Sequence, residues 1–114
     1  MITVETLAAY GADTQTGLSR CMNNEAFYLR LVNMELNDPN FARLQEALQS
    51  GDTRGAFEAA HALKGAAGNL SLTPIYEPVE RLTELLRNAE GPVDTGDLPQ
   101  RVAQAYEALK ALAE

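Results

Sequence analysis

Apolar residues recur at intervals of three and four along most of the chain, which is the spacing of one face of an α-helix. Three narrow seams have this form: Ala56, Ala60, Leu63, Ala67 and Leu70; Ile75, Val79, Leu82 and Leu86; and Leu98, Val102, Ala105, Leu109 and Leu112. An earlier stripe is wider, with Phe27, Leu31 and Met34 flanked by Tyr28, Val32 and Leu36, and continues through Phe41, Leu44 and Leu48. Such faces pack against neighbouring helices. The pattern therefore predicts a core shared by long amphipathic helices.

Capping residues place the boundaries of the first helices. The first short helix is expected to begin after Thr3, its N-cap, and to run through Tyr10. Gly11 follows as a C-terminal residue in the left-handed conformation. Asp13 begins a second short helix that runs to about Met22. Asn23 or Asn24 caps the first long helix, within which Asp38 and Pro39 predict a restart or kink before its end at Gly51.

Later boundaries follow from the same signals. Asp52 caps the helix that ends near Ser71, and Thr73 with Pro74 offers the next cap and first-turn proline. Pro78 would remove one hydrogen bond, so the regular helix is expected to begin near Glu77 and to end at Gly91 and Pro92. Residues 93–97 form a loop, and the last helix starts around Leu98 and Pro99.

Together these elements predict one all-α domain over residues 1–114. The expected architecture is an antiparallel up-down four-helix bundle with one or two short N-terminal helices appended. Ala, Leu, Glu, Gln and Arg favour helix, whereas the β-branched residues are too thinly spread to indicate strands. No internal repeat or second domain is visible.

Charge and composition exclude several classes of function. The formal net charge of −7 disfavours binding to nucleic acid or to an anionic membrane surface. No apolar run approaches the ~20 residues of a membrane span, and the N-terminus does not resemble a signal peptide. Cys21 is the only cysteine, so it forms no internal disulfide, and we expect it to be a small buried apolar residue. A cytoplasmic protein without a bound metal is expected.

The most informative stretch runs from Phe57 to Leu70 and contains His61, the only histidine in the chain. On a helix, His61 shares its face with Glu58 and Phe57 on one side and with Lys64, Gly65, Gly68 and Asn69 on the other. Glycine in a helix interior costs about 1 kcal/mol relative to alanine. The two glycines could leave room for another molecule beside the imidazole, or they could permit close packing between helices.

The residues Ala60-His61-Ala62-Leu63-Lys64-Gly65 resemble the His-x-Leu-Lys-Gly signature of the histidine-containing phosphotransfer (HPt) domain family. The small residues that follow, and the order of helices along essentially the whole chain, are also similar to that family. One position departs from the pattern: the family often has Gly ten residues after the histidine, where this chain has Ser71.

The resemblance implies a phosphoryl carrier in a multistep two-component phosphorelay, without an ATP site of its own. His61 would accept a phosphoryl group through Nε2 from a receiver-domain aspartate and pass it on, and Lys64 would balance charge on the phosphoryl oxygens. An exposed histidine is largely neutral near pH 7, as a nucleophile must be. Gly65 would leave room for the partner's loops, Gly68 and Asn69 would extend the contact surface, and Glu58 could hydrogen-bond the other ring nitrogen. Phe57, Ala62 and Leu72 would supply apolar contact area around the imidazole.

The implied partners are a response-regulator receiver domain, a hybrid sensor kinase, or both, and the chain itself would be monomeric. The Mg2+ ion would belong to the receiver, so no cofactor is expected on this chain. Two alternatives remain: a bundle that binds a receiver without transferring phosphate, and a kinase-like dimer of histidine-bearing bundles. Intact His61, Lys64 and Gly65 disfavour the first, and no ATP-binding segment follows for the second.

Overall fold

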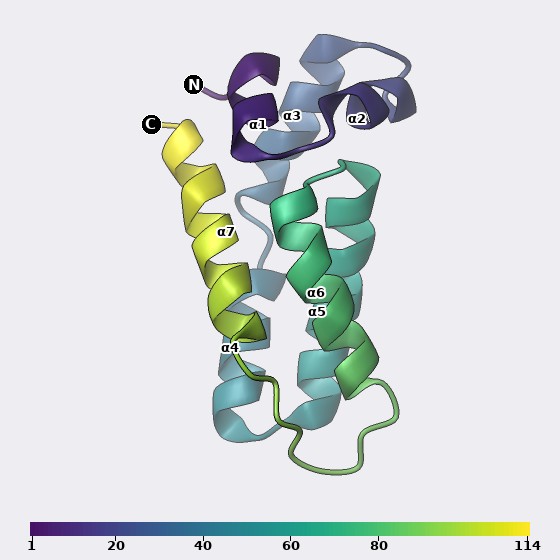
Figure 1. Cartoon of the computed structure of the whole chain (residues 1–114), viewed down its shortest axis with the longest axis vertical. Coiled ribbons are helices and arrows are strands. Elements are labelled where there is room, and N and C mark those ends of the chain that lie inside the picture. Colours follow the sequence, from purple (N-terminus) through teal and green to yellow (C-terminus); the bar gives the residue numbers. More distant parts are fainter.

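The computed structural model describes residues 1–114 and consists of helices and turns without a strand. The helices are α1 (Val4–Tyr10), α2 (Thr14–Arg20), α3 (Glu25–Glu35), α4 (Asn40–Ser50), α5 (Thr53–Asn69), α6 (Thr73–Leu86) and α7 (Leu98–Leu112). Helices α4 to α7 alternate in direction and form an elongated bundle, while α1, α2 and α3 gather at one end of it (Figure 1). The predicted all-α bundle is confirmed.

The core of the bundle is built by the predicted seams. Helix α5 packs against α4 on one side and α6 on the other, and α6 packs against α7. All five positions of the α5 seam and all four of the α6 seam are buried, whereas Ala105 and Leu112 of α7 are only partly buried. The small alanines of α5 let two neighbours approach it closely, since backbone separation depends on the side chains at the contact.

The predicted caps hold for the first helices and for α5. Thr3 Oγ1 accepts a hydrogen bond from the Thr6 N–H at 3.0 Å, and Gly11 has a φ of 118° at the end of α1. Asn24 and Asp52 accept from backbone N–H groups at the starts of α3 and α5. Local side-chain chemistry therefore accounts for these boundaries.

The long stripe from Phe27 to Leu48 belongs to two separate helices. Helix α3 ends at Glu35 and α4 begins at Asn40, whose N–H donates to Asp38 Oδ1 at 2.9 Å. Helix α3, with 11 residues, is therefore a separate helix between the two short N-terminal helices α1 and α2 and the bundle. The line of α3 that faces the core also differs from the expected one: Tyr28, Val32 and Glu35 are buried, whereas Met34 is 62% exposed.

Two expected boundaries of α6 are wrong. The helix begins at Thr73 and continues through Pro78, whose missing N–H removes one bond while its ring is buried in the core. Leu72, not Thr73, occupies the N-cap position. The helix also ends at Leu86, well before Gly91, because Arg87 is extended and Asn88 takes a φ of 58°. Asn tolerates this left-handed conformation better than most residues.

Three tyrosine hydroxyls join the N-terminal helices to the bundle. Tyr10 of α1 donates to the Ala105 carbonyl at 2.8 Å, Tyr28 of α3 donates to the Leu70 carbonyl at 2.9 Å, and Tyr106 of α7 donates to the Leu36 carbonyl. Burial raises the pKa of Tyr10 and raises that of Tyr28 to about 12. The hydroxyl groups of Tyr10 and Tyr28 therefore stay protonated and remain donors at physiological pH.

None of the helices is long and apolar enough to cross a membrane.

A buried carboxyl group lies where α3 ends. Glu35 is 8% exposed, and its Oε1 has no hydrogen-bond partner. Burial raises the pKa of Glu35 to about 8, and the neighbouring Asp38 side chain adds to this. In the unfolded chain a glutamate loses its proton near its ordinary value. The folded state therefore binds the Glu35 proton more tightly than the unfolded state does. As a result, the free energy of unfolding falls as the pH rises from about 4.5 to about 8.

The variant Glu35→Gln is expected to remove this pH dependence. Thermal or urea unfolding from about pH 5 to pH 8.5 should show the wild type losing roughly 2–4 kcal/mol more than the variant. Glu46→Gln, at an exposed position on α4, is the control and should follow the wild type. Parallel pH profiles for wild type and Glu35→Gln would contradict the prediction.

Candidate functional site

His61 lies on the outward face of α5. Its neighbours Ala60 and Leu63 are buried in the bundle, whereas the imidazole is exposed to solvent. The apolar seam therefore fixes the rotation of the helix and turns His61 away from the core. A second molecule can reach the ring without any change in the fold.

Phe57 contacts His61 from the preceding turn of the same helix. The two ring centroids are 5.7 Å apart with an interplanar angle of 14°, an offset stack. Glu58 Oε1 lies 3.3 Å from Arg54 Nε, so in this structure the Glu58 carboxylate pairs with an arginine of its own helix. Leu72 is completely buried and lies in the core. Of the three residues expected to supply apolar contact around His61, Phe57 alone is seen to stack on it.

Lys64 lies one turn beyond His61 and faces α6. Its side chain is 28% exposed, and its Nζ lies 3.9 Å from Glu84 Oε1. A hydrogen bond from Arg87 is the main cause that lowers the pKa of Glu84, and the Lys64 charge contributes less. The site therefore offers one cation beside the imidazole, held loosely by a carboxylate of the next helix.

The two glycines of this face have different surroundings. A Cβ on Gly65 would meet no atom within 4 Å, so nothing inside the protein requires glycine there. A Cβ on Gly68 would lie 3.2 Å from Tyr76 Cε1 of α6, which is tighter than an ordinary contact. Gly68 therefore has an explanation in helix packing, whereas Gly65 leaves open space beside His61.

The C-terminal end of α5 is held by the N-terminal helices. Arg20 Nη1 donates to the Gly68 carbonyl at 3.1 Å, and the Asp13 N–H donates to the Ser71 carbonyl at 3.0 Å. The Tyr28 hydroxyl occupies the Leu70 carbonyl between them. Gly68 lies in the last turn of α5, and Leu70 and Ser71 follow the helix, so the three bonds join the N-terminal helices to the end of α5 and the turn after it. Asn69, the last residue of α5, is exposed beside them.

Ser71 ends the site helix in the left-handed conformation, with a φ of 55°. This region costs an L-residue roughly 1–2 kcal/mol, and glycine escapes the cost. Where the HPt pattern often has an unstrained glycine, this chain therefore has a strained serine. The backbone geometry that glycine would favour is present.

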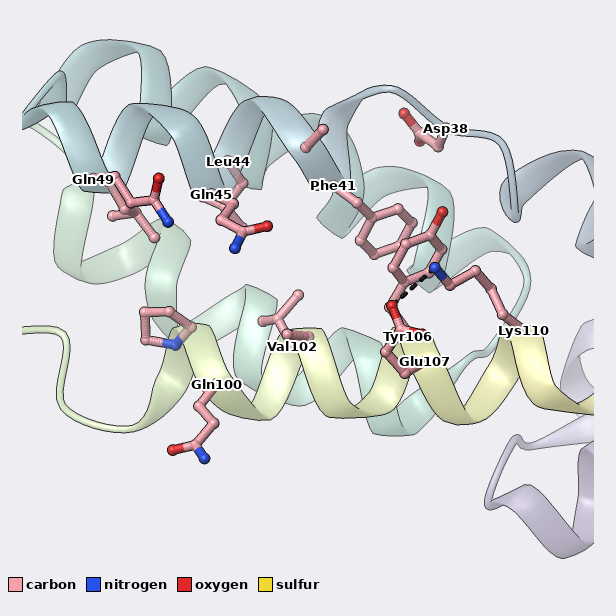
Figure 2. A pocket seen from close by; sticks show the side chains of 14 residues that line it. Asp38, Phe41, Leu44, Gln45, Gln49, Gln100, Val102, Tyr106, Glu107 and Lys110 are labelled. Carbon is pink, nitrogen blue, oxygen red and sulfur yellow. Dashed lines mark ion pairs between the residues drawn. The ribbon is translucent and has the colours of Figure 1, made fainter.

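A separate groove lies on another side of the bundle. A groove of about 480 Å3 runs between α4 and α7, with Phe41 stacked on Tyr106 across it (Figure 2). Lys110 lies over the Tyr106 ring and pairs with Glu107 at 2.8 Å. No residue of α5 lines this groove, so it is separate from the His61 face. No group of three or more His, Cys, Asp or Glu side chains is placed to hold a metal ion.

In a comparison with known protein families, the model of the Hpt domain family matches residues 34–112 of the chain. The matched segment includes α5 with His61 and the rest of the bundle. The chain therefore belongs to the Hpt domain family, whose members are phosphocarrier modules of histidine phosphotransfer. Comparisons with curated proteins and with solved structures returned no match.

The structure gathers His61, Lys64 and Gly65 on one accessible face and leaves Glu58 paired with Arg54. It also adds Glu84 and Arg87, which sequence reasoning did not single out. Both are charged residues near the end of α6, and their approach to α5 depends on how the two antiparallel helices align. No local pattern in the sequence reports that alignment.

Ser71→Gly is expected to leave stability unchanged or to raise it by up to about 1 kcal/mol, because released strain offsets the extra freedom of the unfolded chain. Ser71→Val should lower stability by more than about 1 kcal/mol, because a β-branched residue is least tolerated at positive φ. Urea unfolding of the two variants checks this. Equal stability of the Val and Gly variants would show that the strain is absent.

Gly65→Ala is expected to stabilise the protein by about 0.5–1 kcal/mol, since alanine favours the helix interior and the added methyl group meets open space. Gly68→Ala is the matched comparison and should gain less, because its methyl group presses on Tyr76. Thermal unfolding measures both. A Gly65→Ala variant that is less stable than wild type would point to an internal role for this glycine.

Proposed function

We propose that His61 is the phosphoacceptor of this Hpt domain and that it exchanges phosphoryl groups with the aspartate of a receiver domain. The observation that carries the proposal is the exposed imidazole of α5, with a lysine one turn away and open space at Gly65. Family membership adds the class of reaction. The partner is a response regulator, a hybrid sensor kinase, or each in turn.

The chemistry asks little of this chain beyond position. The lone pair of the unprotonated ring nitrogen attacks phosphorus, an N–P bond forms, and the P–O bond to the aspartyl oxygen breaks so that a carboxylate leaves. Such a transfer depends on alignment of the attacking and leaving atoms and on neutralisation of charge. Lys64 would balance charge on the transferred oxygens. The Mg2+ ion would be supplied by the receiver domain.

The open space at Gly65 favours transfer over an adaptor that only binds. A partner's loops must come close to the imidazole for in-line attack, and a side chain at position 65 would stand in their way. An adaptor would have no need of a bare helix at that turn, since glycine there weakens the helix. The need for a partner to approach His61 would therefore explain why glycine is kept at position 65, although it lowers helix stability and no packing contact requires it.

The proposal is tested by incubating the protein with Mg2+ and a phosphorylated receiver domain, then assaying for an acid-labile, alkali-stable phosphoryl group. Wild type should acquire the label and His61→Gln should not. Because His61 is exposed, the variant should keep its helicity and melting temperature. Equal labelling of the variant would place the phosphoacceptor elsewhere, and no labelling of a folded wild type would contradict phosphotransfer.

Gly65→Ala belongs in the same assay. It should accept phosphate more slowly than wild type even though its fold is more stable, because the methyl group occupies space that the partner needs. Faster or unchanged transfer would remove Gly65 from the contact surface.

A further inference from the structure

The C-cap residue of α6, Arg87, reaches the aromatic neighbour of His61. The Arg87 guanidinium carbon lies 5.4 Å from the centroid of the Phe57 ring, a cation–π distance. The same ring stacks with the imidazole at 5.7 Å. Phe57 therefore links an arginine of α6 to the histidine of α5.

Glu84 completes a second link between the same helices. Arg87 donates from Nη2 to Glu84 Oε1 at 3.1 Å and from Nε to Oε2 at 3.4 Å, so the pair is bidentate. Glu84 Oε1 also lies 3.9 Å from Lys64 Nζ. A chain of contacts therefore connects His61 to Lys64 through Phe57, Arg87 and Glu84. Its first and last residues, His61 and Lys64, lie one turn apart on the same face of α5.

We propose that Arg87 and Glu84 are positioning residues for this site: Arg87 holds Phe57 against the imidazole, and Glu84 holds both Arg87 and Lys64. The orientation of the ring follows from the stacking contact alone, whereas its consequence for transfer rests on the proposed function. Neither residue needs to touch the phosphoryl group. Glu84 acts from the last turn of α6, and Arg87 acts from its C-cap position, on side chains of α5.

Exposure argues that the pair serves orientation more than stability. The Arg87 side chain is 42% exposed and that of Glu84 is 52% exposed, and ion pairs at such positions contribute little to folding. A bidentate arginine–carboxylate pair nevertheless has a defined geometry. Transfer reactions are sensitive to small misplacements of the attacking atom. Loss of the pair should therefore disturb the site without unfolding the protein.

The experiment measures the His61 ring protons by NMR together with the rate of phosphoryl transfer from a receiver domain. Stacking on Phe57 shields those protons, so Phe57→Leu defines the unstacked chemical shifts. Arg87→Gln and Glu84→Gln should move the His61 resonances toward the Phe57→Leu values and slow transfer by about tenfold. Both variants should keep the wild-type melting temperature.

Arg30→Gln is the matched control, because Arg30 is an exposed arginine of α3 whose guanidinium carbon lies 5.7 Å from the centroid of Phe27, a cation–π contact that involves no residue of the His61 site. It should leave the His61 resonances and the transfer rate unchanged. Wild-type resonances in Arg87→Gln would overturn the proposal, and so would a slower rate without a change in resonances. If wild type accepts no phosphate, the proposed function fails, and the resonances still decide whether Arg87 and Glu84 orient the ring.

Discussion

The structure depends on one constraint: α5 must bury two sides and leave a third free. It packs against both α4 and α6, and the buried positions that make this possible are chiefly alanines. Small side chains permit close approach on two sides, which larger ones would prevent. The remaining face carries His61, and its exposure follows from the packing of the other two. Site and core are thus consequences of the same helix rotation.

The N-terminal helices hold the end of that helix. Residues 1–33 precede the part of the chain that matches the Hpt family, yet they supply the Tyr28, Arg20 and Asp13 donors to the carbonyl groups that end α5. Gly17 is part of the arrangement, because a Cβ there would lie 2.6 Å from the Tyr28 ring and hydroxyl. The orientation of the site helix therefore depends on residues outside the family match.

The glycines show what a motif leaves open. Gly65 and Gly68 stand three residues apart on one face, and sequence reasoning allowed both partner clearance and helix packing for each. Their surroundings separate the two explanations, since Tyr76 of α6 fills the space at Gly68 and nothing fills it at Gly65. Of the two glycines, only Gly65 sets the stability of the fold against access to His61, because alanine at this position would stabilise the helix but would occupy the open space beside the imidazole.

The sequence by itself determined the features that act within a turn or two: the apolar seams, the caps at Thr3 and Asp52, and the phosphotransfer motif around His61. Only the tertiary structure decided the continuation of α6 through buried Pro78, the burial of Glu35 in place of Met34, and the approach of Arg87 and Glu84 to the site. Periodicity and capping are local properties of a chain. The alignment of one helix with the next is set by packing across the whole core.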